Sequence, residues 1–262
     1  MARLDQIPAH YTARLRGLLF DLDDTLLDEG KLLPEALDAL YRLKQAGFEL
    51  HAVTGRPAGW GAVLAHQWPV DGALTENGAI YLKKEARRVT LEDPLSAEER
   101  QQRRAELEAV VSELRRRFPS LVPADDTWQR LSDFTFDIGE YQRVPKQEVF
   151  QVRKAARELG ANTLASSVHL HITLDRADKA SGSARCLSAR YGIDPFQVLL
   201  SYAFIGDSEN DAACFAAFRL TLGVKNQSGR PTLPPRFLCQ AERAHGFVEA
   251  ANLLLARRRD AG

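Results

Sequence analysis

The feature that most constrains the fold is a series of short apolar runs that end abruptly in polar residues. Leu15 to Phe20 is such a run, and Phe48 to Val53 is a second. Between them lies an amphipathic segment that Pro34 opens and Gly47 ends, which predicts a helix. Apolar runs separated by a helix indicate buried parallel strands, and open parallel sheets bind ligands at the carboxyl ends of their strands.

The middle of the chain, residues 79–176, has a different pattern. We expect an inserted α+β domain there, because hairpin, helix and alternating strand patterns follow one another without the earlier rhythm. After Lys179 the α/β rhythm returns. The sequence therefore predicts a Rossmann-like α/β core made of residues 1–78 and 177–262, with a cap of residues 79–176. The expected cap elements are a hairpin (Tyr81-Leu82 with Arg88 to Leu91), helices at Ser96 to Phe118 and Pro145 to Leu159, a strand at Leu131 to Ile138, and two strands within Asn162 to Leu174.

Composition limits the class of partner. The 262 residues include 35 Lys and Arg and 35 Asp and Glu, with no long block of one sign, so the basic surface of a nucleic-acid binder is not expected. Three widely spaced cysteines fit reduced thiols, and neither a signal peptide nor a membrane span is recognised. We expect a cytoplasmic monomer or homodimer that binds a small phosphorylated metabolite, without a membrane or nucleic-acid partner.

Asp21 and Asp23 follow the first apolar run directly. Residues two apart on an extended chain point to the same side, with Cα atoms about 7 Å apart. A phosphoryl group fits between two such carboxylates, so that one attacks phosphorus while the other donates a proton to the departing oxygen. Taken alone, however, two aspartates at this spacing are more often surface carboxylates that cap a turn.

Later strand ends carry further candidates, each with an ordinary alternative. Thr54 offers a hydroxyl to a phosphate oxygen or simply caps a helix, and Lys179 brings a point charge to a phosphoryl group or is a surface lysine. The segment Gly206-Asp207-Ser208-Glu209-Asn210-Asp211 offers hard oxygen ligands for Mg²⁺ or caps a helix. Glu76-Asn77-Gly78 is a hinge, a substrate-facing turn or a plain turn.

Together these motifs resemble the four-motif pattern of the haloacid dehalogenase superfamily. They are Asp21-Leu22-Asp23-Asp24-Thr25, Thr54, Lys179, and Gly206-Asp207 with Asn210-Asp211. The large insert, preceded by Thr75-Glu76-Asn77-Gly78-Ala79, resembles the subfamily with an α+β cap that includes sucrose-phosphate phosphatases, mannosyl-3-phosphoglycerate phosphatases, Cof-type phosphatases and α-phosphomannomutases. The usual Gly after the second Asp of the first motif is Asp24 here, a departure that affects loop geometry.

The resemblance implies roles for these positions. Asp21 is implied as the nucleophile, Asp23 as the general acid and base with its carbonyl on Mg²⁺, and Thr54 and Lys179 as residues that hold the phosphoryl group. The implied metal set is Asp21, Asp23, Asp207 and Asp211. The predicted substrate-binding set is Thr54, Gly55, Arg56, Glu76, Asn77, Lys179, Asn210, His169 and His171.

Alternation along the insert places polar side chains on one face of its sheet. His169, His171, Thr173 and Asp175 share a face, as do Asp133, Thr135 and Asp137. This polar face could roof the active site and bind a hydroxylated leaving group, or it could simply face solvent. The two histidines could also bind Zn²⁺, although a third ligand is not evident.

The leading functional prediction is a Mg²⁺-dependent phosphatase that hydrolyses a small phosphomonoester, above all a sugar phosphate, through an aspartyl-phosphate. The alternatives are a phosphomutase of the α-phosphomannomutase type, which would return the phosphoryl group to a rotated sugar, and a non-catalytic phosphate-binding protein on the same scaffold.

Overall fold

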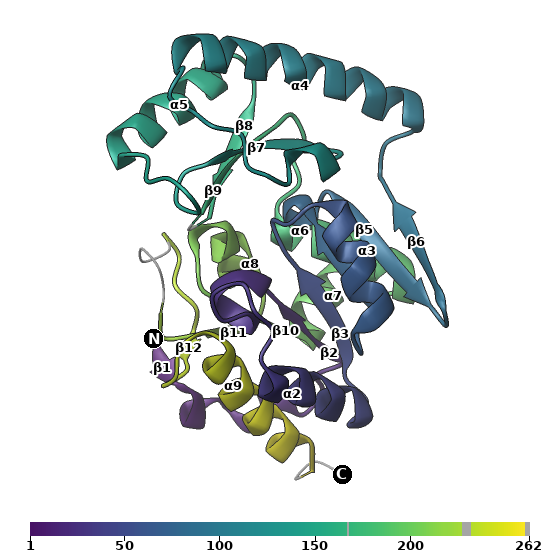
Figure 1. Cartoon of the computed structure of the whole chain (residues 1–262). Helices are drawn as coiled ribbons and strands as arrows, with labels where there is room; N and C mark the ends of the chain where they lie inside the picture. Colours follow the sequence, from purple (N-terminus) through teal and green to yellow (C-terminus); the bar gives the residue numbers. More distant parts are fainter. Residues whose placement is uncertain (167, 227–231, 260–262) are drawn as a thin grey trace.

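A large, mostly parallel sheet and a smaller antiparallel sheet organise the computed structural model, which describes residues 1–166, 168–226 and 232–259 (Figure 1). Helices cover both faces of the large sheet, and the smaller sheet with its two helices lies beyond the carboxyl ends of the central strands. Among the described helices, none combines the length and apolarity needed to cross a membrane.

The large sheet has nine strands in the order β1-β12-β11-β10-β2-β3-β4-β5-β6. Pairing is parallel from β1 to β4 and antiparallel from β4 to β6. Successive strands run to both sides of β2, so the strand order reverses there. The strands are β1 (Ala2–Arg3), β2 (Gly17–Phe20), β3 (Glu49–Val53), β4 (Gly72–Thr75), β5 (Ile80–Glu85), β6 (Arg88–Glu92), β10 (Tyr202–Gly206), β11 (Leu220–Gly223) and β12 (Phe237–Leu238).

Two helical layers enclose this sheet. One apolar cluster joins α2, α3 and α9 to one face, and a second joins α6, α7 and α8 to the other. The central strands β2, β3 and β10 are almost wholly buried between them, as their apolar sequences predict. The helices are α1 (Ala9–Thr12), α2 (Pro34–Gln45), α3 (Ala58–Gln67), α6 (Lys179–Tyr191), α7 (Pro195–Ser201), α8 (Ala212–Ala217) and α9 (Arg243–Arg259), with short helical turns at Leu4–Gln6, Leu22–Leu26, Glu76–Gly78, Thr127–Gln129 and Glu209–Asp211.

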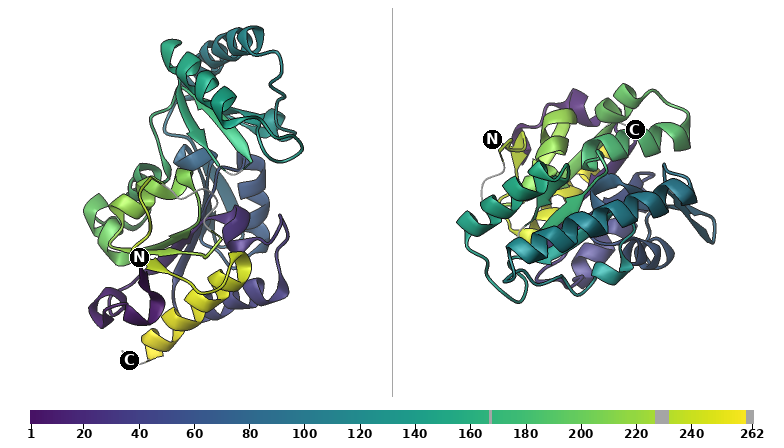
Figure 2. Two further views of the ribbon diagram at one scale, coloured as in Figure 1. Left: turned by 90° about the vertical axis from the view of Figure 1, so that its left-hand side faces the viewer. Right: turned by 90° about the horizontal axis from the view of Figure 1, so that it is seen from above.

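The smaller sheet has three antiparallel strands in the order β7-β9-β8. Its apolar face packs against α4 and α5 around Leu107, Phe136, Val152 and Leu170. Seen from above, these two teal helices lie across the top of the molecule (Figure 2). The elements are α4 (Ala97–Arg117), β7 (Asp133–Asp137), α5 (Lys146–Glu158), β8 (Asn162–Ala165) and β9 (His169–Thr173). The polar face therefore points toward the large sheet.

The predicted hairpin lies elsewhere than expected. β5 and β6 form it, but β5 pairs with β4, so the hairpin extends the large sheet and not the smaller one. The reason is local: Ile80, Tyr81 and Leu82 are buried, and the tight turn at Glu76–Gly78 reverses the chain directly beside β4. The division of the chain into folding units stays a prediction.

Candidate active site

The polar residues that follow β2, β3 and β10 meet at one edge of the large sheet. Asp21 follows β2, Thr54 follows β3 and Asp207 follows β10. Because these strands are parallel neighbours, their carboxyl ends lie side by side. The predicted core motifs therefore lie in one place.

Lys179, at the start of α6, connects two of these carboxylates. Its Nζ donates to Asp21 Oδ1 at 2.6 Å and to Asp211 Oδ1 at 2.7 Å, with the lysine side chain fully buried. Burial lowers the pKa of Lys179, but the two carboxylates outweigh burial and raise it. Burial raises the pKa of Asp21, and the ammonium of Lys179 offsets only part of this rise. Lys179 is thus buried, and the alternative of an ordinary surface lysine does not hold.

Asp21, Asp207 and Asp211 form a buried acidic cluster whose ligand atoms lie within 4.8 Å of one another. Asp211 Oδ2 accepts from the amides of Asp207 and Ser208 at 2.9 and 3.1 Å, which fixes the loop after β10. Three carboxylates thus lie beside a single lysine, Lys179. Such an excess of hard carboxylate oxygens fits a divalent cation of the Mg²⁺ type.

Asp23 stands beside this cluster and is held by an arginine. Arg56 Nε and Nη2 bond the two carboxylate oxygens of Asp23 at 2.9 and 2.8 Å. The guanidinium also lies 4.8 Å from the centre of the Trp60 ring, which limits its motion. In this arrangement both oxygens of Asp23 face Arg56.

Thr54 and Asn77 shape the loops around the phosphoryl position. Thr54 Oγ1 accepts from the Arg56 amide at 3.0 Å, and the Thr54 carbonyl accepts from the Asn77 amide at 3.0 Å. Asn77 has φ +56° and accepts from Asn210 Nδ2 at 3.1 Å. Thr54 is buried, and among the described residues its hydroxyl accepts a hydrogen bond but donates none.

The smaller sheet covers these loops with a buried charged network. Asp133 Oδ2 lies 2.7 Å from His171 Nδ1, and Arg130 Nη1 donates to Asp133 and to the carbonyl of Gly55. Burial raises the pKa of Asp133, but Arg130 and His171 outweigh this and lower it to about 2. Burial lowers the pKa of His171 despite Asp133.

These contacts fix the orientation of the His171 ring. With Asp133 ionised, Nδ1 carries the proton and Nε2 of the neutral ring is an acceptor. That edge lies so close to Gly55 that a Cβ there would be 3.1 Å from Nε2 and Cε1. A side chain at position 55 would therefore require the ring to move by a few tenths of an ångström.

His169 is held separately. Its Nε2 lies 2.8 Å from Glu140 Oε2. In the described part of the chain, the group of three possible metal ligands contains neither histidine. Among the described residues, His169 and His171 therefore have no third ligand with which to bind Zn²⁺.

Glu76, predicted to bind substrate, accepts hydrogen bonds from the protein itself in this structure. Its buried carboxylate accepts from the amides of Ala58, Leu131 and Ser132 and from the Ser132 hydroxyl, at 2.6 to 3.2 Å. All of its acceptor capacity faces these donors, so it joins the large sheet to the segment that leads into β7. A role of Glu76 in substrate binding stays a prediction.

A small cavity of about 20 Å³ lies at the centre of the site, room for one or two water molecules. Of the predicted residues, seven line it, and Lys179, Asp207 and Asp211 lie behind Asp21. The lining is Asp21, Asp23, Gly55, Arg56, Ser166, Val168, His169, His171, Ser208 and Asn210. The polar face of the smaller sheet is thus a roof over the core motifs and not a solvated surface.

Sequence reasoning missed the residues that hold this site from a distance. Asn226 Nδ2 donates to the carbonyl of Asp24 at 3.0 Å and to Asp207 Oδ2 at 3.4 Å, and Thr25 Oγ1 donates to Asp207 Oδ1 at 3.3 Å. Arg130 was also missed. Its carboxylate partners at i−4 and i+3 were visible in the sequence, but that spacing is equally typical of exposed ion pairs.

Comparison with known proteins agrees with the motif pattern. A family model of haloacid dehalogenase-like hydrolases matches residues 18–109. The search of curated proteins gives no match.

Solved structures share the fold over nearly the whole chain. A Thermoplasma acidophilum protein is 18% identical with a TM-score of 0.72, over 92% of this chain and 98% of its own. A haloacid dehalogenase-like hydrolase from Bacteroides thetaiotaomicron is 16% identical with a TM-score of 0.65, over 91% and 98%. The sucrose-phosphatase from Synechocystis, solved with sucrose and phosphate, is 18% identical with a TM-score of 0.62, over 92% and 98%. These structures confirm the predicted α/β fold. The family model agrees with the predicted resemblance over the residues that it matches.

Proposed function

We propose that this protein is a Mg²⁺-dependent phosphatase that hydrolyses a small phosphomonoester through an aspartyl-phosphate on Asp21. The convergence of Asp21, Lys179, Asp207 and Asp211 in one buried cluster carries the proposal. A surface pair of carboxylates would need neither a buried lysine nor two further aspartates behind it. The solved sucrose-phosphatase with the same fold makes sugar phosphates the first substrates to test.

In the proposed first step, a carboxylate oxygen of Asp21 attacks phosphorus and the bond from phosphorus to the leaving oxygen breaks. Asp23 gives its proton to that oxygen. Arg56 faces both oxygens of Asp23 in this structure, so it must release at least one of them for this transfer. In the second step, Asp23 takes a proton from water, which attacks phosphorus and frees phosphate and Asp21.

The remaining residues orient and balance charge. The Lys179 ammonium holds Asp21 in place and puts positive charge beside the phosphoryl oxygens. Asp21, Asp207 and the carbonyl of Asp23 would hold Mg²⁺, while Asp211 orients the loop through the amides of Asp207 and Ser208. When bound, the metal would neutralise phosphoryl charge and clamp its oxygens.

The test is a phosphate-release screen over sugar phosphates, glycerates and nucleotides with Mg²⁺. We expect turnover that EDTA stops and Mg²⁺ restores, and that Asp21→Asn removes, while Asp38→Asn on the exposed face of α2 keeps it. Thermal unfolding of Asp21→Asn should show an intact fold, because the change is nearly isosteric. More than a few per cent of activity in Asp21→Asn would contradict the covalent role.

Product analysis addresses the alternative reactions. Isomerised sugar phosphate without free phosphate would favour the phosphomutase. No phosphate release from any ester of the panel would favour the binding protein.

A further inference from the structure

The central cavity is too small for a leaving group. A volume of about 20 Å³ leaves no room for even a small sugar beside the phosphoryl group. Under the proposed function, the leaving group must therefore extend into space that adjoins this cavity. Two larger grooves flank the smaller sheet.

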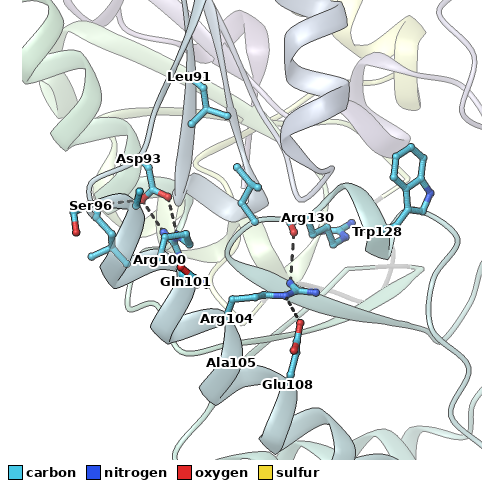
Figure 3. A pocket seen from close by; sticks show the side chains of 13 residues that line it. Leu91, Asp93, Ser96, Arg100, Gln101, Arg104, Ala105, Glu108, Trp128 and Arg130 are labelled. Carbon is cyan, nitrogen blue, oxygen red and sulfur yellow. Dashed lines mark hydrogen bonds and ion pairs between the residues drawn. The ribbon is translucent and has the colours of Figure 1, made fainter.

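The groove of about 920 Å³ between α4 and the segment 128–131 does not meet this need (Figure 3). None of its lining residues lines the central cavity. Its cations are also engaged, because Arg100 bonds both oxygens of Asp93 at 2.7 and 2.8 Å and Arg104 bonds Glu108 and the carbonyl of Asp133. It offers neither access to the reaction centre nor a free charge.

The second groove, of about 560 Å³, adjoins the central cavity. Ser166 and Ser208 line both spaces, so the two lie next to each other between β8 and the loop after β10. Val144, Val149 and Phe150 give it an apolar wall, and Phe150 is 63% exposed. A leaving group with an apolar face fits this wall.

Two cations of α5 line the same groove. Lys146 is exposed and has no ion pair within the described residues, and the hydrogen bond of Arg153 there is to the neutral Thr163 hydroxyl, at 3.2 Å. The carboxylate that also lines the groove, Glu209, accepts instead from the amide and hydroxyl of Thr232 at 2.7 and 2.6 Å. The lining of the groove thus holds two cations, Lys146 and Arg153, and one carboxylate, Glu209, which bonds Thr232 and not these cations.

We propose that this groove binds the leaving group of the substrate, which carries an apolar face and, at its far end, an anionic group that pairs with Lys146 and Arg153. The inference rests on the proposed function and makes it narrower. Serines at the neck admit a polar link between the phosphoester and the apolar part. Neutral esters of the same length bind without this ion pair.

A matched pair of esters tests the inference. 4-Ethylphenyl phosphate and 4-(2-carboxyethyl)phenyl phosphate have nearly the same leaving oxygen and differ in a distal carboxylate. We expect kcat/KM to favour the carboxylate by about tenfold, the size of a partly exposed charge-assisted contact. In Lys146→Met/Arg153→Met this ratio should fall to about one. Lys154→Met, exposed on α5 outside the groove lining, should keep the wild-type ratio.

Calorimetry measures the binding of the same two esters to Asp21→Asn. Because this measurement needs no turnover, it separates the inference from the proposed function. A tenfold preference in binding without turnover by the wild type would count against the phosphatase and still support the groove. Equal values for the two esters in the wild type, or a preference that survives in the double variant, would overturn the inference. An equal loss of preference in Lys154→Met would also overturn it, since the cause would then be general surface charge.

Discussion

Replacing Lys179 with methionine should both destabilise the fold and stop the reaction. Methionine keeps most of the volume of the side chain but removes its charge from a site with no solvent exposure. Two partners lose their ammonium together, because Asp21 and Asp211 each bond it within 2.7 Å. The variant therefore leaves two buried carboxylates without the cation that bonds them.

The cost follows from the burial of this pair. Breaking a buried ion pair by removing one partner costs about 3–5 kcal/mol, because an uncompensated charge stays behind. For a chain of 262 residues, 1 kcal/mol corresponds to about 2 °C in Tm, so the variant should unfold about 6–10 °C below the wild type. Lys154→Met makes the same chemical change on an exposed face and should shift Tm by less than about 1 °C.

Magnesium separates the role of the charge from that of packing. Without the ammonium, the cluster of Asp21, Asp207 and Asp211 is more negative and should bind Mg²⁺ more tightly. Saturating Mg²⁺ should therefore stabilise Lys179→Met by about 1–2 kcal/mol more than it stabilises the wild type. Urea unfolding with and without Mg²⁺ measures both quantities. Equal stability of variant and wild type in EDTA, or an equal Mg²⁺ effect on both, would refute this reasoning.

Two other buried groups give independent predictions. Burial lowers the pKa of His51 from 6.5 to about 3. Below pH 6.5 the folded state therefore binds fewer protons than the unfolded state, and the free energy of unfolding decreases as the pH is lowered. At pH 5 the loss from this group is about 2 kcal/mol relative to pH 7, and His51→Gln should flatten the dependence of the urea unfolding free energy by that amount; parallel curves would contradict it. Glu76→Gln places an amide donor against the backbone amides of Leu131 and Ser132, which should cost about 2 kcal/mol of stability. Hydrogen exchange of these two amides should become about 30-fold faster. Unchanged exchange would mean that Glu76 does not join the large sheet to the segment that leads into β7.

Much of the core site follows from local signals in the sequence. An apolar run that stops at Asp21, and another that stops before Asp207, mark strand ends, and parallel order then brings them together. Lys179 was predictable as part of a motif, but its burial was not. No local pattern around it differs from that of a surface lysine, since the carboxylates that bury its charge are 158 and 32 residues away.

Elements without periodicity were missed for a similar reason. The segment of α3, Ala58–Gln67, is rich in small and apolar residues on every side and gives no amphipathic pattern. The hairpin of β5 and β6 was recognised but assigned to the insert, because strand patterns do not say which sheet a strand joins. Glu76 was expected in a hinge or a turn, and its contacts with the distant Leu131 and Ser132 could not be predicted from that pattern.

Asp24 illustrates how the tertiary structure supports an unusual local choice. The superfamily pattern has glycine here, and Asp24 indeed adopts φ +58°, a conformation that favours glycine but that aspartate tolerates better than most residues. Arg243 Nε lies 3.4 Å from its carboxylate, and Asn226 accepts from the Arg243 amide while donating to the Asp24 carbonyl. The start of α9 thus holds the strained loop from outside. Because the same Asn226 also contacts Asp207, the geometry of the nucleophile loop and that of the acidic cluster depend on one side chain.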